Sequence, residues 1–245
     1  ILSLNVAGLK SAMANGLSLS DYDIVCLQET KINETPKLDF PYIYCSNAKR
    51  KGYSGTLIAS KTPFEFMNHF PTNKNHEAVE MVIDEGRICY CIDKKRKLII
   101  VSLYSPNSKP KLERLEYRIN IYQDYLTKAL SKIPTDYNVI VCGDFNSLTT
   151  ENDVHKYNPK IPGCTPEEIE AHNKLKKKTK LIDVAEFTNR IEYTYYSYRT
   201  PNAFQRKMGY RLDYIFVNDS KMISKFDTVY LKGISDHCAL ILETL

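Results

Sequence analysis

Short apolar runs of four to seven residues recur along the chain and are separated by polar turns, a pattern that is typical of β-strands. Many of these runs are rich in Ile, Val and Tyr, which favour extended backbone. We predict about eleven strands, in the runs ILSLN, IVCLQ, GTLIAS, AVEMVI, ICYCI, LIIVSLY, NVIVCGD, YTYYSY, DYIFVN, FDTVYL and CALILE.

Helical periodicity is clear in two places. Across residues 111–132, apolar side chains recur every three or four residues and form one stripe; they are Leu112, Leu115, Ile119, Tyr122, Leu126 and Leu130. The segment TPEEIEAHNKLKKK predicts a second helix, with Thr165 as its N-cap and Pro166 at its first position. Many strands with few helices predict an α/β (α+β) fold of two packed sheets with helices outside.

The chain has the length of one domain, and no repeat or Gly/Ser linker divides it, so we expect residues 1–245 to form a single catalytic domain. No apolar run reaches the roughly 20 residues that cross a bilayer, and no basic segment precedes Ile1 as in a signal peptide. We therefore expect an intracellular protein without a membrane anchor, in the nucleus or the cytoplasm. Because the chain does not begin with Met, we expect further residues upstream.

The seven cysteines include no CxxC pair, and several lie inside apolar strand-like runs such as IVCLQ and VIVCGD. A free thiol in such a run behaves as a small hydrophobic residue. We predict reduced core cysteines in a reducing compartment rather than zinc ligands.

The net charge of +5 comes with basic clusters at residues 49–51, 94–97 and 174–180. Such clusters fit a phosphate-rich partner. However, DKKRK fits a solvated hairpin turn equally well, and KLKKKTK fits an exposed helix face. Charge alone therefore leaves nucleic-acid binding open.

Seven acidic, amide or imidazole side chains lie at the ends of predicted strands. They are Asn5, Glu29, Asp144, Asn146, Asp213, Asp236 and His237. In a sandwich these ends can meet at one rim, and oxygen ligands without thiolates suit Mg²⁺ before Mn²⁺ or Ca²⁺. Because Mg²⁺ commonly completes its shell with phosphate oxygens, the set implies a phosphate ester substrate.

Purely structural roles are open for the same residues. Asn5 could cap a turn, Glu29 could pair with Lys31, and Asp144 could cap a loop, while a lone His near a terminus is often structural. The seven residues together indicate a functional site more strongly than any one of them does alone.

Read in order, LNVAGL, CLQET, KGYSGT, YSPN, RLEYR, GDFN, TPEE, YRLDYIFV and SDHCAL resemble the exonuclease III-type apurinic/apyrimidinic endonucleases. The similarity is collinear from Leu4 to Leu240. GDFN and SDH alone indicate only the wider endonuclease/exonuclease/phosphatase superfamily, whereas KGYSGT, RLEYR, TPEE and RLDY narrow it to the abasic-site branch. The resemblance implies a four-layer α/β sandwich of two mostly antiparallel sheets flanked by helices.

The resemblance also implies metal-dependent hydrolysis of DNA 5′ to an abasic site, leaving a 3′-hydroxyl, with Mg²⁺ as the cofactor and Mn²⁺ as a possible substitute. By position, the metal-site residues are Asn5, Glu29, Asp236, Asp144 and Asn146. The implied partner is double-stranded DNA with abasic sites, and we expect a monomer.

The implied catalytic residues divide the work of hydrolysis. His237, oriented by Asp213, would bind the scissile phosphate or act as the base, and Asp144, beside Asn146, would activate or position the water. Tyr104 would donate to the phosphate or to the leaving oxygen. Sequence leaves open whether Asp144 or His237 takes the proton.

Substrate contacts implied by position lie in three segments. They are Lys51 and Tyr53, then Asn107, and then the abasic-pocket residues Tyr195, Tyr210 and Leu212. Here the chain departs from the family, because tyrosines stand where Phe and Trp are typical and the chain contains no Trp. Ala7 also replaces a frequent acidic or amide residue, Pro110 replaces a DNA-inserting Arg, and Arg199 replaces a Met. We expect a wetter pocket, a changed metal site and a different grip on DNA.

Three alternatives remain. A LINE-type retrotransposon endonuclease that nicks undamaged DNA fits the Tyr-rich segment EYTYYSYR. A phosphatase of inositol phosphates or phospholipids fits the superfamily motifs but not RLEYR or KGYSG. A non-enzymatic nucleic-acid binding module fits least, since the catalytic set is complete.

Overall fold

The computed structural model of the protein describes residues 1–71 and 75–245. In this part of the chain, twelve strands form two six-stranded sheets. The first sheet has the order β11 (Ile223–Tyr230), β12 (Cys238–Thr244), β1 (Leu2–Asn5), β2 (Ile24–Gln28), β4 (Thr56–Ser60) and β3 (Tyr42–Ser46). The second has the order β5 (Glu65–Met67), β6 (Ile88–Asp93), β7 (Leu98–Tyr104), β8 (Asn138–Asp144), β10 (Asp213–Val217) and β9 (Ile182–Asp183).

Each sheet contains one parallel strand pair, β1–β2 in the first and β7–β8 in the second, and its other pairs are antiparallel. Parallel strands end at the same edge, so Asn5 lies next to Gln28 and Tyr104 next to Asp144. Asp213, at the start of antiparallel β10, is also paired with Asp144. The topology thus gathers polar strand ends at one end of the sandwich.

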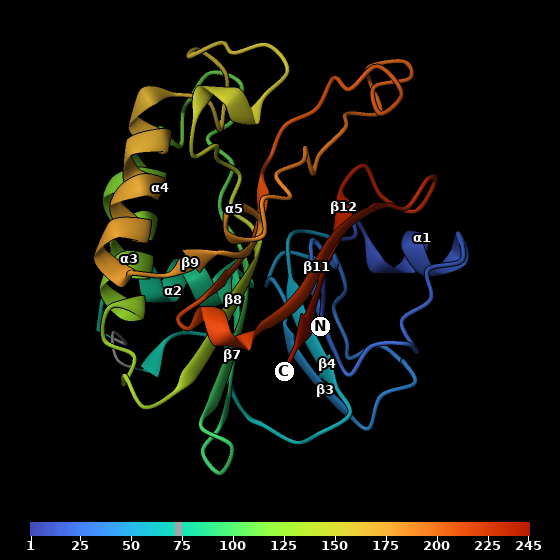
Figure 1. The fold of residues 1–245 in the computed structure, drawn as a ribbon, viewed down its shortest axis with the longest axis vertical. Helices are drawn as coiled ribbons and strands as arrows, with labels where there is room; N and C mark the ends of the chain where they lie inside the picture. Colours follow the sequence, from blue (N-terminus) through green and yellow to red (C-terminus); the bar gives the residue numbers. More distant parts are fainter. Residues whose placement is uncertain (72–74) are drawn as a thin grey trace.

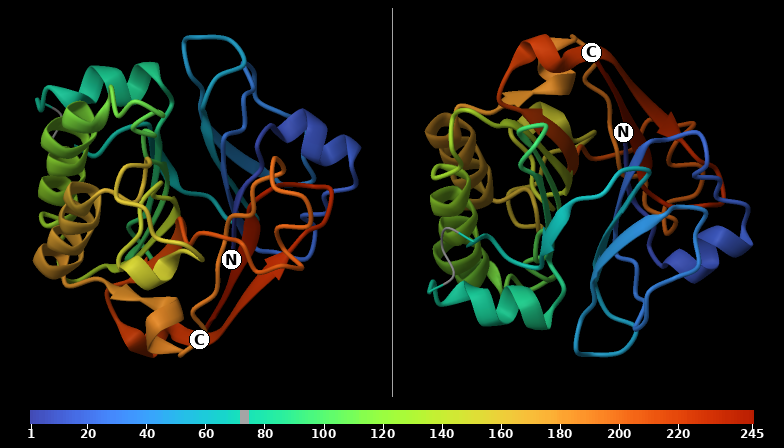
Figure 2. Two further views of the ribbon diagram at one scale, coloured as in Figure 1. Left: turned by 90° about the horizontal axis from the view of Figure 1, so that it is seen from above. Right: turned by 90° about the horizontal axis from the view of Figure 1, so that it is seen from below.

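The molecule has four layers, which Figures 1 and 2 show from three directions. Helices α2 (Ala78–Asp84), α3 (Asp124–Leu130) and α4 (Pro166–Thr179) cover the outer face of the second sheet, and α1 (Leu9–Ala14) lies on the outer side of the first. Between the sheets, buried side chains from both form one core, which includes Cys26, Cys89, Cys91 and Cys142. The predicted four-layer α/β sandwich is confirmed.

Two predicted strands are wrong. AVEMVI forms helix α2, in which Ala78 and Val82, four residues apart, are buried together; its short apolar pattern fits either structure. In YTYYSY, only Tyr195 makes isolated bridges, to Tyr210 and His237. The prediction also missed β3, β5 and β9, because edge strands are short or partly exposed and carry a weak apolar signal.

The predicted helix over residues 111–132 is shorter than expected. A π-helical segment, η2 (Tyr117–Gln123), leads into α3. In this segment Arg118 lies on the buried face with Tyr122, whereas Leu112 and Leu115 are half-buried. The second helix is confirmed as α4, with a capping box between Thr165 and Glu168. Short helical turns complete the fold at η3 (Glu151–Asp153), α5 (Val184–Phe187) and η4 (Ser220–Met222).

All seven cysteines are free thiols, and all except the half-buried Cys45 are buried. Residues 94–97 form the hairpin turn between β6 and β7, at the opposite end of β7 from Tyr104. The lysines of residues 174–180 lie mainly on the exposed face of α4. Within the described residues, no helix is long and apolar enough to span a membrane.

Candidate active site

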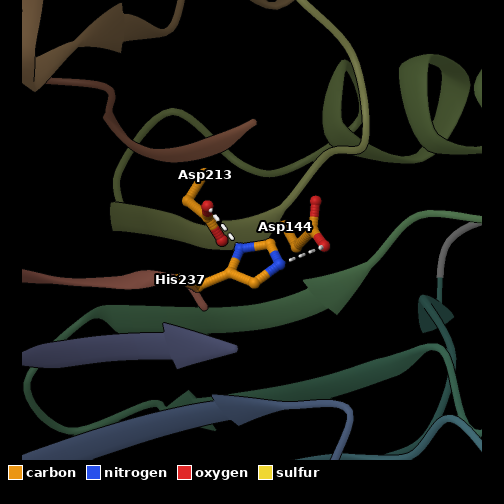
Figure 3. Close-up of side chains that lie close together, drawn as sticks. All are labelled: Asp144, Asp213 and His237. Atoms are coloured by element: carbon orange, nitrogen blue, oxygen red, sulfur yellow. Dashed lines mark hydrogen bonds and ion pairs between the residues drawn. The ribbon is translucent and has the colours of Figure 1, made fainter. Parts of the chain in front are cut away.

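A buried imidazole lies between two carboxylates at the polar end of the sandwich (Figure 3). His237 Nδ1 is 2.8 Å from Asp213 Oδ2, and His237 Nε2 is 4.0 Å from Asp144 Oδ2. Asp213 Oδ2 also accepts a 2.7 Å bond from the Thr194 hydroxyl. The ring is therefore oriented from one side and presents its other nitrogen toward Asp144.

The strand ends fix this geometry through the backbone. Ser235 donates from its hydroxyl to the Asn5 carbonyl (2.6 Å) and accepts from the His237 amide (3.1 Å), so the turn before β12 is joined to the end of β1. Gly143 has φ 139°, and a Cβ there would lie 1.9 Å from the Leu103 carbonyl oxygen. Only glycine lets β8 run this close to β7 just before Asp144.

A second carboxylate centre adjoins the first. The amide nitrogen of Asn5 donates to Glu29 Oε1 (3.2 Å) and to Asp144 Oδ2 (2.9 Å). The Tyr104 hydroxyl donates to Glu29 Oε1 (2.7 Å), and Lys31 Nζ lies 3.1 Å from Glu29 Oε2. Asn5 therefore connects the two carboxylates and keeps them close together.

Glu29 and Asn146 both have left-handed backbone, with φ 49° in each. This conformation is rare for residues other than Gly, and especially for Glu, and it turns each side chain sharply at the end of its strand. Asn146 donates from its side chain to Asp144 Oδ2 (3.3 Å) and to the Ser105 carbonyl (2.9 Å), and it accepts from Asn107 (3.1 Å). The loops after β7 and β8 are thus held together around Asp144.

Ionisation differs across the cluster. Burial and the neighbouring charge of Asp213 raise the pKa of Asp144 to about 7. Burial alone would lower the pKa of His237, but the charge and hydrogen bond of Asp213 outweigh it and raise that pKa to about 10. Burial would likewise raise the pKa of Glu29, but the Tyr104 hydrogen bond and the Lys31 charge outweigh it and lower that pKa. The surroundings thus favour the charged form of His237 and the protonated form of Asp144.

The donor set fits a hard divalent cation. Carboxylate oxygens of Glu29 and Asp144 lie on either side of Asn5, and Asp236 is half-buried just before His237. Burial raises the pKa of Asp236 although the charge of His237 opposes it, so the ionised form of Asp236 gains from a nearby positive charge. Ligand atoms of Asp144, Asp213 and His237 also lie within 4.8 Å of one another. Oxygen-rich sites of this kind suit Mg²⁺ or Mn²⁺ better than zinc.

Of the outer residues predicted from sequence, Tyr195 and Asn107 contact residues of this centre. The Tyr195 ring is 4.8 Å from that of His237 and 6.0 Å from that of Tyr210. Tyr210 and Leu212 are half-buried against a small apolar cluster. Lys51 is exposed, and Tyr53 is half-buried.

Sequence reasoning missed several residues that hold the site. Arg118, which is buried, donates to the carbonyls of Pro106 and Phe145 (2.6 Å each) and lies 3.4 Å from Glu168. It therefore joins the loop of Asn107 to the loop of Asp144. RLEYR contains Arg118 and TPEE contains Glu168, and the sequence signal was a charged residue four positions before the buried Tyr122. Thr194 and Ser235 lie beside predicted residues and carried no separate signal.

A carboxylate-rich end of a two-sheet sandwich, with one imidazole held between acids, is an arrangement typical of hydrolytic active sites. The chain belongs to the endonuclease/exonuclease/phosphatase family, whose model matches residues 2–237.

Within this family, the chain is similar to nucleases that act on DNA. It is 30% identical to an exodeoxyribonuclease of Bacillus subtilis, over 97% of this chain and 96% of the relative. It is 32% identical to a DNA-(apurinic or apyrimidinic site) endonuclease of Dictyostelium discoideum, over 98% of this chain and 69% of the relative. The fold is similar to the crystal structure of an AP endonuclease from Leishmania major, with a TM-score of 0.84 at 23% identity, over 98% of this chain and 86% of that one. These similarities confirm the resemblance and favour it over the retrotransposon and phosphatase alternatives.

Proposed function

We propose that this enzyme hydrolyses a phosphodiester bond of double-stranded DNA on the 5′ side of an abasic site, leaving a 3′-hydroxyl, with Mg²⁺ or Mn²⁺ as its cofactor. The observation that carries the proposal is the continuous set of contacts from Glu29 through Asn5 to Asp144, with His237 4.0 Å beyond. The relatives named as an abasic-site endonuclease and an exodeoxyribonuclease support the choice of DNA.

The proposed metal site consists of Glu29, Asn5 and Asp236, with Asp144 and Asn146 beside it. When bound, the cation offsets the negative charge of the phosphate and of the oxygens that develop charge during attack. Asn5 directs its amide nitrogen to Glu29 and Asp144 and so keeps the two carboxylates at a fixed spacing.

Proton transfer is assigned from the ionisation of the two central groups. Asp144, with a pKa raised to about 7, is the proposed acceptor of the water proton. His237, with a pKa raised to about 10, stays protonated and is the proposed donor to a phosphate oxygen. As the water oxygen bonds to phosphorus, the bond from phosphorus to the 3′ oxygen breaks. The Tyr104 hydroxyl is proposed to donate to the phosphate or to that leaving oxygen.

The outer residues are proposed to bind the DNA itself. Lys51, Tyr53 and Asn107 would contact the backbone near the lesion, and Tyr195, Tyr210 and Leu212 would surround the abasic sugar. Since two of these pocket residues carry hydroxyls, we further propose 3′-phosphodiesterase or 3′-to-5′ exonuclease activity on intact ends. The unit that acts is proposed to be one domain, residues 1–245, as a monomer.

The products of a single turnover test this function. A duplex with one tetrahydrofuran abasic analogue is incubated with the enzyme in Mg²⁺ and, separately, in EDTA, and the fragment ends are identified by mass. We expect a 3′-hydroxyl fragment and a 5′-phosphorylated analogue with Mg²⁺ and none with EDTA. Cleavage on the 3′ side, or equal cleavage in EDTA, would reject the proposal.

A further inference from the structure

Arg87, the first residue before β6, is among the most buried charged residues described, with 1% of its surface exposed. Burying a guanidinium is costly unless its donors and its charge are satisfied. Arg87 has such partners on several sides, and none of them belongs to the set of acids around His237. The role of Arg87 is therefore not to pair with the catalytic acids.

The contacts of Arg87 converge on Tyr104. The guanidinium lies 4.6 Å above the centre of the Tyr104 ring, within the range of a cation–π interaction. Its Nη1 donates to the Tyr104 carbonyl (3.3 Å), and the Tyr104 amide donates to the Arg87 carbonyl (2.9 Å). The ring and both backbone polar groups of Tyr104 are thus held by one residue, which fixes the direction of the hydroxyl toward Glu29.

The same guanidinium reaches the loop of the KGYSG motif. Arg87 Nη2 donates a hydrogen bond to the Tyr53 hydroxyl (2.8 Å), and Arg114 Nη1 donates a second one to the same hydroxyl (3.3 Å). Glu85 balances both cations, lying 2.8 Å from Arg87 and 2.9 Å from Arg114. Arg87 therefore connects Tyr53, on the proposed DNA-binding loop, with Tyr104 at the proposed reaction centre.

We infer that Arg87 is a positioning residue, which holds the Tyr104 hydroxyl in its reactive direction and joins it to Tyr53 in the DNA-binding loop. This inference rests on the proposed function, because it assigns Arg87 an effect on the same hydrolysis. Arg87 touches neither the acids around His237 nor the proposed scissile bond, so its effect on the chemical step passes through Tyr104, whereas its bond to Tyr53 acts on DNA binding.

A double-mutant cycle of Arg87→Met and Tyr104→Phe tests the connection in single-turnover cleavage of the abasic duplex. We expect Arg87→Met to lower the rate about tenfold or more in the wild type but less than about twofold in the Tyr104→Phe background. Arg87→Lys, which keeps the cation over the ring, is expected to recover part of the rate. Equal losses in both backgrounds would overturn the inference, because a purely structural role is additive.

Arg211 offers a matched control. It is also buried, lies 4.5 Å above the Tyr214 ring and pairs with Asp183 at 2.5 Å. Arg211→Met should lower the rate by the same factor in the wild type and in Tyr104→Phe. If it coupled to Tyr104 as strongly as Arg87→Met does, the special position of Arg87 would be rejected.

A crystal structure of Arg87→Met separates this inference from the proposed reaction. We expect the Tyr104 hydroxyl to leave Glu29, whatever the substrate of the enzyme. An unchanged Tyr104–Glu29 hydrogen bond would overturn the positioning role. Failure of the wild type to cleave abasic DNA would instead reject the proposed function and leave the structural result to decide on Arg87.

Discussion

The floor of the site and its rim are built in different ways. The floor is defined by Asn5, Asp144, Asp213 and His237, and the rim by Lys51, Asn107, Tyr195 and Arg199. Every floor residue is buried at the end or start of a strand, or in the turn that enters one. The rim residues lie in loops and are exposed or half-buried. This contrast suggests that the floor determines the chemistry and that the rim determines which DNA is cleaved.

Floor residues also serve two purposes at once. Asn5 Oδ1 accepts from the Ala7 amide (3.0 Å) as a turn cap, while its nitrogen faces the two carboxylates. Asp144 Oδ1 accepts from the Asn146 amide (2.7 Å), while its other oxygen faces Asn5 and His237. In Asp144 the structural and functional roles therefore use different oxygens, whereas in Asn5 the oxygen that a metal ion would need is the one that caps the turn.

The largest expected effect is the loss of a floor residue. We predict that His237→Ala lowers single-turnover cleavage about 10³-fold, because it removes the cation proposed to face the phosphate. Binding of abasic duplex, measured by fluorescence anisotropy in Ca²⁺, should change less than about threefold, because rim contacts remain. Turnover that survives in His237→Ala would remove this residue from the mechanism.

The pH dependence of the wild type should also report the floor. Asp144 must lose its proton to act as acceptor, so kcat/KM should rise with pH up to about 7. His237 must keep its proton, so kcat/KM should fall as pH passes about 10. A bound divalent cation favours ionised Asp144 and moves the rising limb below 7. A rate that falls between pH 6 and 8 would contradict these assignments.

A smaller effect is expected at the pocket wall. Tyr195→Phe keeps the ring beside His237 and removes only the hydroxyl, so the pocket should become drier. We predict that the ratio of abasic-site cleavage to 3′-end exonuclease activity rises by a factor of about ten or less. The two activities are measured on one labelled duplex, with Tyr198→Phe, an exposed tyrosine three residues away, as the control. An unchanged ratio would show that the Tyr195 hydroxyl has no effect on the selectivity for abasic sites.

The smallest expected effect is that of one rim charge. Lys51→Ser should weaken DNA binding severalfold and reduce the slope of log K against log salt by about 0.9, as for one lost phosphate contact. Lys95→Ser is the matched change, since Lys95 is also exposed but lies in the hairpin at the other end of the sandwich. Both variants are titrated with DNA by anisotropy between about 50 and 200 mM salt. Equal effects of the two substitutions would show that Lys51 makes no phosphate contact beyond that of any exposed lysine.

Some parts of the fold and the site can be predicted from the sequence, and others cannot. The ends of strands can be predicted, because an apolar run that stops at Asn5 or Asp144 indicates both a strand and the residue at which it ends. What holds the floor is harder to predict: Arg118 is a charged residue on the buried face of η2, and Arg87 precedes a strand without any pattern of its own. Contacts of buried charges depend on tertiary packing, which local periodicity does not report.

Loops are the least predictable part. The segment YTYYSY has the composition of a strand, yet it forms only the isolated bridges of Tyr195, and its backbone hydrogen bonds are divided between Tyr210 and residues 236–238. Its position beside His237 emerges only in three dimensions. Selectivity therefore has to be measured rather than deduced from the aromatic content of the rim.

The most direct test of the central claim compares two substrates under identical conditions. Single-turnover rates in Mg²⁺ are measured on a duplex with one abasic analogue and on the same duplex with an intact nucleotide at that position. The account predicts cleavage at the lesion at least about 100-fold faster than internal cleavage of the intact duplex, with both abolished by EDTA. Equal internal cleavage of the two duplexes would contradict the account and identify an endonuclease of undamaged DNA.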